Sequence, residues 1–430
     1  MDKIVIKGGN KLNGEIIIAG SKNSSLPIIA ATIMCQEEVS LLDIPHIQDS
    51  VSMLHLISCL GGKITIDGPV DNGFGFPLRQ VKINCEKFDK CIASYDIVRK
   101  MRASVLILGP LLARFGKAEI SLPGGCTIGA RPVNLHIEGL EKLGAKIEID
   151  SGFIKASVQG KLRGAVIDFS TVSVGATENI LMAAALAEGQ TIINNAAKEP
   201  EIIALGEFLQ AMGVQIKGLG SSQIIVDGVE KLCSATYKIP ADRIEAGTYA
   251  IAAAITDGKI IMHNTNFSLF NEFKTVFQQS GVKLSQEKPN QVIAERHPDG
   301  LKPCKIETAI YPGFPTDLQA QMMALLLYAD GVSEISENIF ENRFMHVPEL
   351  IRMGAKIDIL HNKAIIYGGK KLKGASVMAS DLRASVSLII AGLVAEETTE
   401  VHRIYHLDRG YDFLSGKLAE CGANLIRIKN

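Results

Sequence analysis

The sequence predicts an α/β protein made of six similar modules, and three observations support this fold class. A helix end followed by glycine, a small residue, a polar residue and a strand start recurs six times along the 430 residues. A second pattern, in which a strand leads through a short polar junction into an apolar helix, recurs once in each copy. A chain of this length is also too long for a single core, so we expect two or three domains.

The glycines of the first pattern are evenly spaced and lie at Gly61, Gly144, Gly213, Gly281, Gly354 and Gly422. Glycine suits the position just after a helix, where the backbone adopts a positive φ before it enters a strand. Solenoid repeats span only 20 to 50 residues, whereas this repeat covers about 70 residues and includes two helical stretches and several strands. Each repeat is therefore expected to form a compact α/β module.

The polar junctions of the second pattern precede apolar helices at residues 21–24, 95–104, 173–177, 242–245, 316–319 and 381–385. Equivalent positions of a repeat occupy equivalent places in space, so we expect the junctions to gather on one face of each three-module domain. Helix N-termini carry unpaired N–H groups and partial positive charge, which suit an anion. Two such faces opposed across a cleft would form an anion-binding active site.

The composition excludes several classes of protein. A hydrophobic content of 47% and a net charge of -1 describe an ordinary globular protein, not a disordered or nucleic-acid-coating one. The apolar segments 322–329 and 386–395 are shorter than the roughly 20 residues of a membrane span, and the first residues lack the apolar core of a signal peptide. The eight cysteines contain no Cys-x-x-Cys pair, which argues against zinc and disulfides and fits a reducing cytoplasm.

A loop at residues 121–136 presents one cysteine and one arginine. Its three glycines and two prolines exclude a helix interior or a central strand. Cys126 is flanked by small residues and Arg131 follows five positions later. Cys126 would be a proton donor if its pKa is ordinary, or a nucleophile if Arg131 and loop N–H groups lower it. An unremarkable surface loop is the alternative interpretation.

Further charged residues lie in the junctions and in glycine-bearing loops. Lys22, Arg102, Arg131 and Arg409 are candidate anion-binding cations. Asp317 comes directly before an apolar helix, where it either complements the helix dipole or acts as a general base. The sequence contains no P-loop, no Rossmann fingerprint and no metal-ligand spacing of histidines, and we interpret His136 and His346 as structural.

The junctions and loops together resemble one family, the bacterial UDP-N-acetylglucosamine enolpyruvyl transferases of the wider EPSP synthase family. The resemblance runs from end to end in family order, and the Pro-Gly-Gly-Cys…Gly-Ala-Arg-Pro loop is specific to this family. The matching segments are Lys22-Asn23 and residues 101–104, 122–132, 173–177, 314–317, 340–344, 381–385 and 408–411.

The resemblance implies an inside-out α/β barrel with two domains of three βαβαββ repeats each, one at residues 22–240 and one at 1–21 plus 241–430. The active site would lie in the cleft between them. The implied reaction transfers the enolpyruvyl group of phosphoenolpyruvate to the 3-hydroxyl of UDP-N-acetylglucosamine and releases phosphate. This is the first committed step of peptidoglycan synthesis. No metal, cofactor, nucleic acid, membrane or obligate protein partner is implied.

The resemblance also implies roles for individual residues. Cys126 would protonate the methylene carbon of phosphoenolpyruvate and form the covalent adduct targeted by fosfomycin, and Asp317 would be the base for the sugar hydroxyl. Lys22, Arg131 and Arg409 would hold the phosphate and carboxylate. The remaining residues expected at the substrates are Asn23, Arg102, Pro132, Val133, Asn134, Leu135, Ser173, Val174, Gly175, Ile339, Arg343 and Asp381.

Two departures from the family pattern leave alternatives open. The family usually has Asp at the position of Asn134 and often Lys at that of Thr171, so nucleotide contacts are expected to be weaker or rearranged. A paralogue that binds the UDP-sugar without catalysis is one alternative. A shikimate-pathway enolpyruvyl transferase is another, although the Cys126 loop argues against it. The neutral charge and 5% aromatic content disfavour a nucleic-acid role.

Overall fold

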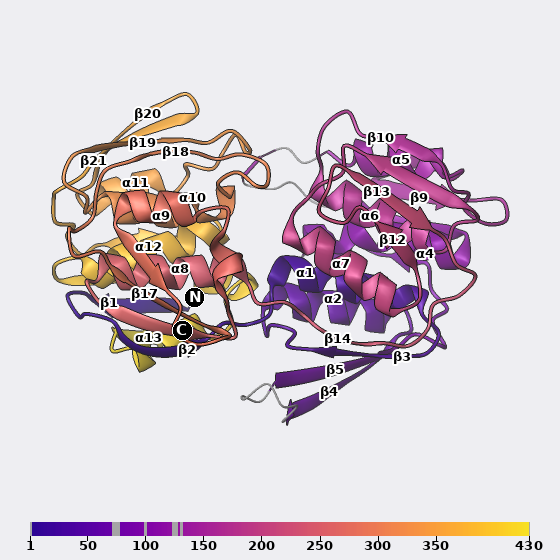
Figure 1. Ribbon diagram of the computed structural model, residues 1–430, viewed down its shortest axis with the longest axis horizontal. Coiled ribbons are helices and arrows are strands. Elements are labelled where there is room, and N and C mark those ends of the chain that lie inside the picture. The colour runs from indigo at the N-terminus through magenta and orange to yellow at the C-terminus, as the bar shows by residue number, and fades with distance from the viewer. Residues whose placement is uncertain (1, 71–77, 99–100, 123–127, 130–131, 430) are drawn as a thin grey trace. The chain divides into compact units, whose positions relative to one another are not determined.

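The computed structural model describes residues 2–70, 78–98, 101–122, 128–129 and 132–429 (Figure 1). These divide into two compact units. Unit 1 comprises Met1–Ala19, Thr127–Ala130 and Ala241–Asn430, and unit 2 comprises Gly20–Cys126 and Arg131–Pro240. Each unit contains three four-stranded sheets.

All six sheets have the same strand order. A short edge strand runs parallel to a central strand, which pairs with an antiparallel strand, and a second antiparallel strand forms the other edge. In unit 2 the sheets are β14 (Thr236–Lys238), β3 (Glu38–Leu42), β5 (Leu78–Asn84), β4 (Lys63–Val70); β6 (Ile92–Ala93), β7 (Lys117–Ser121), β9 (Phe153–Ser157), β8 (Lys146–Asp150); and β10 (Val166–Asp168), β11 (Gln190–Asn194), β13 (Gln223–Asp227), β12 (Gln215–Lys217). In unit 1 they are β2 (Asn13–Ile17), β15 (Lys259–His263), β17 (Gln291–Arg296), β16 (Val282–Ser285); β18 (Lys305–Glu307), β19 (Val332–Ser336), β21 (Lys363–Tyr367), β20 (Lys356–Leu360); and β22 (Ser376–Met378), β23 (Thr398–His402), β1 (Lys3–Lys7), β24 (Asn424–Ile428).

Each unit has three inner helices that follow the polar junctions. They are α1 (Lys22–Ala31), α4 (Leu108–Phe115) and α6 (Val174–Ala185) in unit 2, and α8 (Arg243–Ile255), α10 (Gln319–Leu326) and α12 (Leu382–Val394) in unit 1. The helical turns η2 (Arg102–Ile107) and η4 (Thr316–Leu318) lead into α4 and α10. Every residue of α8 and α10 is buried, as expected for helices that are apolar all round. The predicted junctions therefore lie at the starts of buried helices.

Six outer helices lie between the inner helices and the sheets. They are α2 (Gln48–Cys59), α5 (Asn134–Lys142), α7 (Pro200–Ala211), α9 (Lys274–Ser280), α11 (Val347–Arg352) and α13 (Leu414–Glu420). Shorter helical segments are α3 (Tyr95–Val98), η1 (Thr32–Met34), η3 (Phe267–Phe270) and η5 (Ile404–Arg409). Each outer helix ends just before one of the six repeat glycines, whose φ angles lie between 88° and 110°. This confirms the helix-end interpretation of the repeat.

Two edge strands are exchanged between the units. Along the chain, β10 precedes α6 and pairs with β11, which follows that helix. By that rule β2 would pair with β3, but β2 pairs with β15 of unit 1 and β14 pairs with β3 of unit 2. The modules are otherwise βαβαββ, so helices form the inside of each unit and sheets form its outside (Figure 1).

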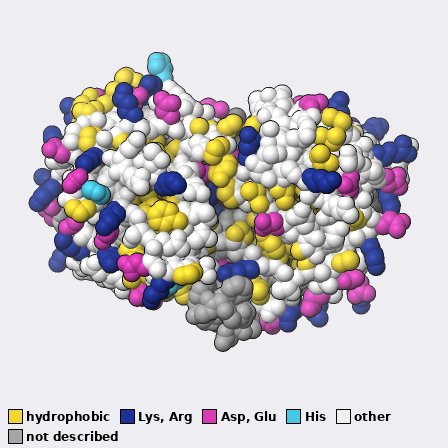
Figure 2. All heavy atoms as spheres, viewed as in Figure 1, with side chains coloured by type: hydrophobic (Ala, Val, Ile, Leu, Met, Phe, Trp, Pro, Cys, Tyr) yellow, Lys and Arg dark blue, Asp and Glu magenta, His cyan; other side chains and the backbone are white. Residues whose placement is uncertain are grey.

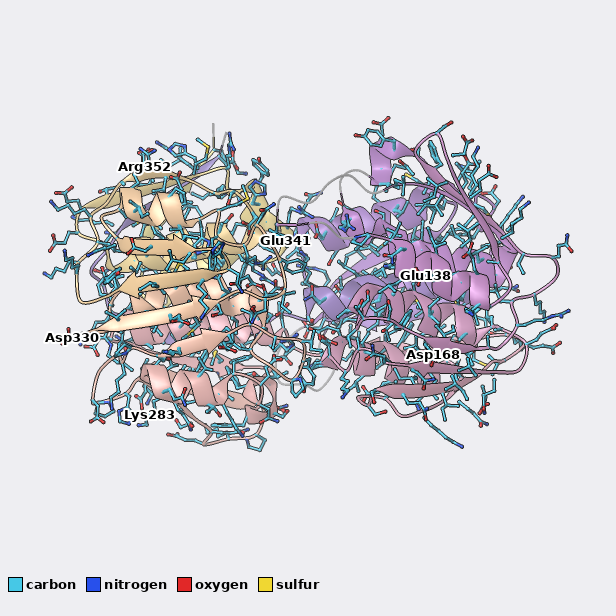
Figure 3. All side chains as sticks on the ribbon, turned by 90° about the horizontal axis from the view of Figure 1, so that it is seen from above. Glu138, Asp168, Lys283, Asp330, Glu341 and Arg352 are labelled. Atoms are coloured by element: carbon cyan, nitrogen blue, oxygen red, sulfur yellow. The ribbon has the colours of Figure 1, made fainter. Side chains whose placement is uncertain are left out.

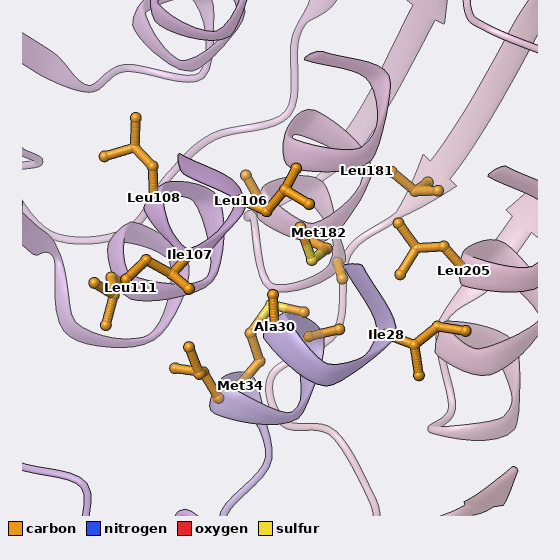
Figure 4. Close-up of a cluster of buried hydrophobic side chains, with 14 of the residues drawn as sticks. Ile28, Ala30, Met34, Leu106, Ile107, Leu108, Leu111, Leu181, Met182 and Leu205 are labelled. Atoms are coloured by element: carbon orange, nitrogen blue, oxygen red, sulfur yellow. The ribbon is translucent and has the colours of Figure 1, made fainter. Parts of the chain in front are cut away.

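Each unit has its own hydrophobic core. In unit 2 the side chains of Ile28, Met34, Leu111, Met182 and Leu205 come together from α1, η1, α4, α6 and α7 (Figure 4). Strand residues alternate between buried and more exposed, so one face of each sheet covers the helices. Basic and acidic side chains are intermixed on the face shown in Figure 2. Within the described ranges, no helix combines the length and apolarity needed to cross a bilayer.

Candidate active site

The predicted base, Asp317, lies between two buried arginines in unit 1. Arg343 Nη2 donates to Asp317 Oδ1, and Arg383 Nη2 donates to Oδ2, both at 2.6 Å. The two arginine side chains are only 4% and 6% exposed, whereas that of Asp317 is 27% exposed. Burial lowers the pKa of Arg383, but the Asp317 carboxylate outweighs burial and the pKa lies above its usual value. The carboxylate is thus fixed in orientation and still accessible.

A buried polar network holds Arg383 in place. Arg383 Nη1 donates to the Tyr411 hydroxyl at 3.2 Å, and that hydroxyl lies 2.9 Å from Thr248 Oγ1. Gln321 Nε2 lies 3.2 Å from the same hydroxyl and 2.9 Å from the Asp317 carbonyl oxygen, to which it donates. Burial raises the pKa of Tyr411. Because Thr248, Gln321 and Arg383 come from α8, α10 and α12, the network joins all three inner helices beneath Asp317.

The N-termini of α8 and α12 already hold carboxylates. Asp242 Oδ1 accepts from Ile244 N at 2.8 Å, and Asp381 Oδ1 accepts from Arg383 N at 2.9 Å. This corrects the expectation of open anion sites at these two helix starts, because each helix is capped by its own side chain. The predicted substrate residue Asp381 is therefore a helix cap in this structure.

His346 and Arg409 complete the charged surroundings of this cluster. His346 is buried, and burial lowers its pKa to about 4, with Asp381 and Arg343 as its nearest charged influences. Arg409 ends η5 and is half-buried. Its neighbour Asp408 receives two bonds from Arg427, at 2.7 and 2.8 Å, which anchor the end of η5 to β24.

In unit 2, Lys22 is the first residue of α1 and forms an ion pair with Asp49. The two charged atoms are 2.9 Å apart, and the side chains are 15% and 4% exposed. Ser21 caps the helix by accepting from Ser24 N at 3.2 Å. Asn23 follows Lys22 and is half-buried. Lys22 is therefore held at the helix start by a buried carboxylate on α2.

A second cluster of unit 2 joins Arg102, His136 and Gly175. His136 is buried, and its Nδ1 lies 3.0 Å from Asn179 Nδ2. Burial, aided by the charge of Arg102, lowers its pKa to about 4. A methyl group on Gly175 would lie 3.2 Å from His136 Cε1. The starts of η2, α5 and α6 thus meet around a neutral histidine.

The other predicted residues of unit 2 lie on the same helix starts. Ser173 caps α6 by accepting from Ala176 N at 3.3 Å, and Val174 is the first residue of that helix. Leu135 is buried, Val133 is half-buried, and Pro132, Asn134 and Thr171 are exposed. Asn134 donates to Glu138 Oε1 at 3.3 Å; Figure 3 labels Glu138 on α5.

Cys126 and Arg131 lie outside the described residues. The two described residues between them, Ile128 and Gly129, contact Glu341 and Asn342, with Asn342 N donating to Ile128 O at 3.0 Å. A methyl group on Gly129 would lie 2.1 Å from Glu341 Oε2, and Gly129 has a φ of 154°. Figure 3 labels Glu341.

Four residues of these clusters were not among the predicted site residues. Arg383 and Tyr411 lie inside segments 381–385 and 408–411, so their place in the motifs was an available signal. Asp49 and Glu337 carry no such signal, since their partners become neighbours only in the folded chain. Among the described residues, no cluster of three or more His, Cys, Asp and Glu side chains could hold a metal ion.

Comparison with known proteins places the chain among enolpyruvyl transferases. The pattern of the family described as EPSP synthase (3-phosphoshikimate 1-carboxyvinyltransferase) matches residues 6–418. A protein of Paramagnetospirillum magneticum is 51% identical over 430 residues, covering 100% of this chain and 99% of that one. One of Shewanella amazonensis is 48% identical over 429 residues, covering both chains fully. Both are named UDP-N-acetylglucosamine 1-carboxyvinyltransferase.

Solved structures share the fold at lower sequence identity. The enolpyruvyl transferase NikO from Streptomyces tendae has a TM-score of 0.88 at 22% identity, covering 100% of this chain and 99% of its own. An EPSP synthase from Acinetobacter baumannii has a TM-score of 0.75 at 19% identity and covers both chains fully. The predicted fold class is confirmed. The chain belongs to the EPSP synthase family, within the group of relatives named UDP-N-acetylglucosamine 1-carboxyvinyltransferase.

Proposed function

We propose that the chain transfers the enolpyruvyl group of phosphoenolpyruvate to the 3-hydroxyl of UDP-N-acetylglucosamine and releases phosphate. The supporting observation is the identity of 51% with a relative of that name over the full length of the chain. The reaction would be the first committed step of peptidoglycan synthesis, and through it the chain would serve cell shape and division.

Cys126 and Asp317 would move the protons of this reaction. Cys126 would add a proton to the methylene carbon of phosphoenolpyruvate while the sugar oxygen bonds to the adjacent carbon. Asp317 would take the proton of the sugar hydroxyl. Because the product keeps a carbon–carbon double bond, one methylene proton must then leave together with the phosphate.

The geometry of Asp317 is compatible with a role as base. A carboxylate offers about four acceptor positions, and the two arginines occupy only one on each oxygen. The arginines also fix the direction of the free positions, which favours transfer from a correctly placed hydroxyl. Thr248, Gln321 and Tyr411 would support this arrangement from beneath.

Lys22, Arg131 and Arg409 would neutralise the phosphate and carboxylate of phosphoenolpyruvate. Lys22 is already placed at a helix N-terminus, where the partial positive charge adds to its own. The helix starts around Arg102, Leu135, Ser173 and Gly175 would contact the UDP-sugar, together with Ile339 and Arg343. Asn134, which donates to Glu138 here, would have to rotate before it contacts the nucleotide.

Two finer proposals follow from the same reaction. Fosfomycin would inactivate the enzyme by forming a covalent bond with Cys126. The cytoplasm would be its compartment, and the seven described cysteines, none of which forms a disulfide, support a reducing environment.

The test is to incubate the purified protein with both substrates and to analyse the nucleotide sugar by mass spectrometry. A UDP-sugar carrying an enolpyruvyl ether on its 3-oxygen supports the proposal. Tight binding of UDP-N-acetylglucosamine without any product would instead favour the non-catalytic paralogue suggested by Asn134 and Thr171.

A further inference from the structure

Glu337 is a buried carboxylate at the end of a parallel strand pair in unit 1. It follows β19 directly, and Thr308 follows β18, the parallel neighbour of β19. Thr308 N donates to Ser336 O at 2.9 Å, so the two strands end level with one another. Glu337 is only 4% exposed, which leaves its side chain to contact protein groups.

Four donors from three segments converge on this carboxylate. Its Oε1 accepts from Thr308 Oγ1 at 2.9 Å, from Ile339 N at 2.8 Å and from Phe340 N at 3.1 Å. Its Oε2 accepts from Thr316 Oγ1 at 2.8 Å. Thr316 precedes Asp317, and Phe340 lies three residues before Arg343. One side chain therefore fixes both chain segments that meet in the Asp317–Arg343 ion pair.

The other modules show that this side chain is not required by the fold. After β11 and β15 the equivalent residues are Asn195 and Asn264, with φ angles of 54° and 58°. Each donates to the carbonyl of the residue after its edge strand, Asn195 to Phe169 at 2.9 Å and Asn264 to Ile18 at 2.8 Å. These are ordinary turn residues that cap a strand pair.

In the β19 module that turn bond moves one residue along the chain. Asn338 donates to the Thr308 carbonyl at 3.1 Å, in the manner of Asn195 and Asn264. Glu337 occupies the position before it and is not among the described non-glycine residues with positive φ. The strand-end turn is thus complete without Glu337, whose carboxylate joins two segments that no other module joins in this way.

We propose that Glu337 is a positioning residue for the enolpyruvyl transfer. It holds Thr316 and the Ile339–Phe340 segment together, and so sets the direction in which Asp317 meets Arg343 and the sugar hydroxyl. It acts through these groups and does not itself contact substrate. This inference rests on the proposed function.

The test removes the Thr316 hydroxyl, which links Glu337 to the Asp317 segment. Thr316→Val is expected to lower kcat about tenfold to 100-fold, because small displacements of a catalytic group are costly. The KM for UDP-N-acetylglucosamine should stay nearly unchanged, as for a contact that matters only in the transition state. Thr316→Ser, which keeps the oxygen, is expected to restore kcat.

Thr399→Val is the matched control. Thr399 is fully buried in β23 of the same unit, and its hydroxyl has no hydrogen-bond partner among the described residues. Glu337→Gln is a second probe: its amide oxygen can accept the three Oε1 bonds, and its amide nitrogen can donate to Thr316. We expect turnover close to wild type for both variants.

The outcomes separate the two proposals. A wild-type kcat in Thr316→Val, an equal loss in Thr399→Val, or no recovery in Thr316→Ser would overturn the role of Glu337 while the proposed function stands. A wild-type protein that makes no product would overturn the proposed function, and the positioning role with it. Melting temperatures measured in parallel identify any variant whose loss of kcat is due to unfolding.

Discussion

Arg383 lies between Asp317 and Tyr411 and donates to both, at 2.6 Å to the carboxylate and at 3.2 Å to the hydroxyl. The arginine is buried on α12, so the orientation of the predicted base depends on a residue whose own position is fixed by the tyrosine. This chain of contacts means that a change beneath the site should be felt at Asp317.

Replacement of Asp317 by Asn should reduce turnover strongly. We expect a loss of about 10²- to 10⁴-fold in kcat, because the amide cannot take the hydroxyl proton. Stability should also fall, by about 3 kcal/mol, since two buried arginines lose their shared counter-charge. Steady-state kinetics and denaturant unfolding measure the two effects. Glu334→Gln, which breaks an exposed ion pair with Lys363, is the control and should leave turnover unchanged. Asp317→Asn turnover within tenfold of wild type would contradict the assignment.

Replacement of Tyr411 by Phe should weaken both stability and turnover. The change removes the hydroxyl shared by Arg383, Thr248 and Gln321, and unsatisfied buried donors cost about 1–3 kcal/mol. Chemical denaturation and kcat are the measurements. Tyr367→Phe removes a hydroxyl that donates to Asp358 at 2.9 Å on the exposed surface, and it should have little effect. If the two variants behave alike, the buried network does not position Arg383.

Replacement of Cys126 by Ser should abolish both turnover and covalent labelling by fosfomycin. A hydroxyl is a far weaker acid and nucleophile than a thiol at neutral pH. Intact-protein mass spectrometry after fosfomycin treatment is the measurement. The exposed Cys233 supplies the control, since Cys233→Ser should keep full labelling. Labelling that persists in Cys126→Ser would assign the adduct to another cysteine.

Two buried histidines should make the protein less stable in acid. The pKa of both His136 and His346 is about 4 in the folded chain and about 6.5 when unfolded. Between these values the unfolded chain binds more protons, so the free energy of unfolding falls as pH drops from about 6.5 towards 4. Each histidine contributes up to about 3 kcal/mol of this loss.

The contribution of one histidine can be isolated by comparing variants. Glu178, whose pKa is raised by burial, acts in the opposite sense, so the slope of wild type alone is a sum. Urea unfolding at pH 7 and pH 5 should show a smaller change for His346→Gln than for wild type. The exposed His361→Gln should match wild type. An unchanged slope in His346→Gln would exclude its role.

Much of the fold could be predicted because it is written in local pattern. Gly61 and Gly422, at opposite ends of the chain, both take a positive φ after a helix, as backbone sterics require. Lys22 and Asp317 were found because they lie at junctions before apolar helices. The exchange of β2 and β14 could not be predicted from these patterns, because both strands have the same sequence character as unexchanged ones.

The candidate site was less predictable, since its contacts join distant segments. Asp49 and Arg383 pair with residues 27 and 66 positions away, and no spacing rule selects such partners. Asp381 was expected to face substrate, whereas the structure shows it capping α12. The assignment of domains, the roles of Cys126 and Arg131, and one shared cleft remain predictions.

The most direct test of the proposed function is phosphate release from phosphoenolpyruvate with two alternative acceptors. The proposal predicts release with UDP-N-acetylglucosamine, and none with shikimate 3-phosphate or without acceptor. Release with shikimate 3-phosphate alone, or no release at micromolar enzyme with either acceptor, would contradict it.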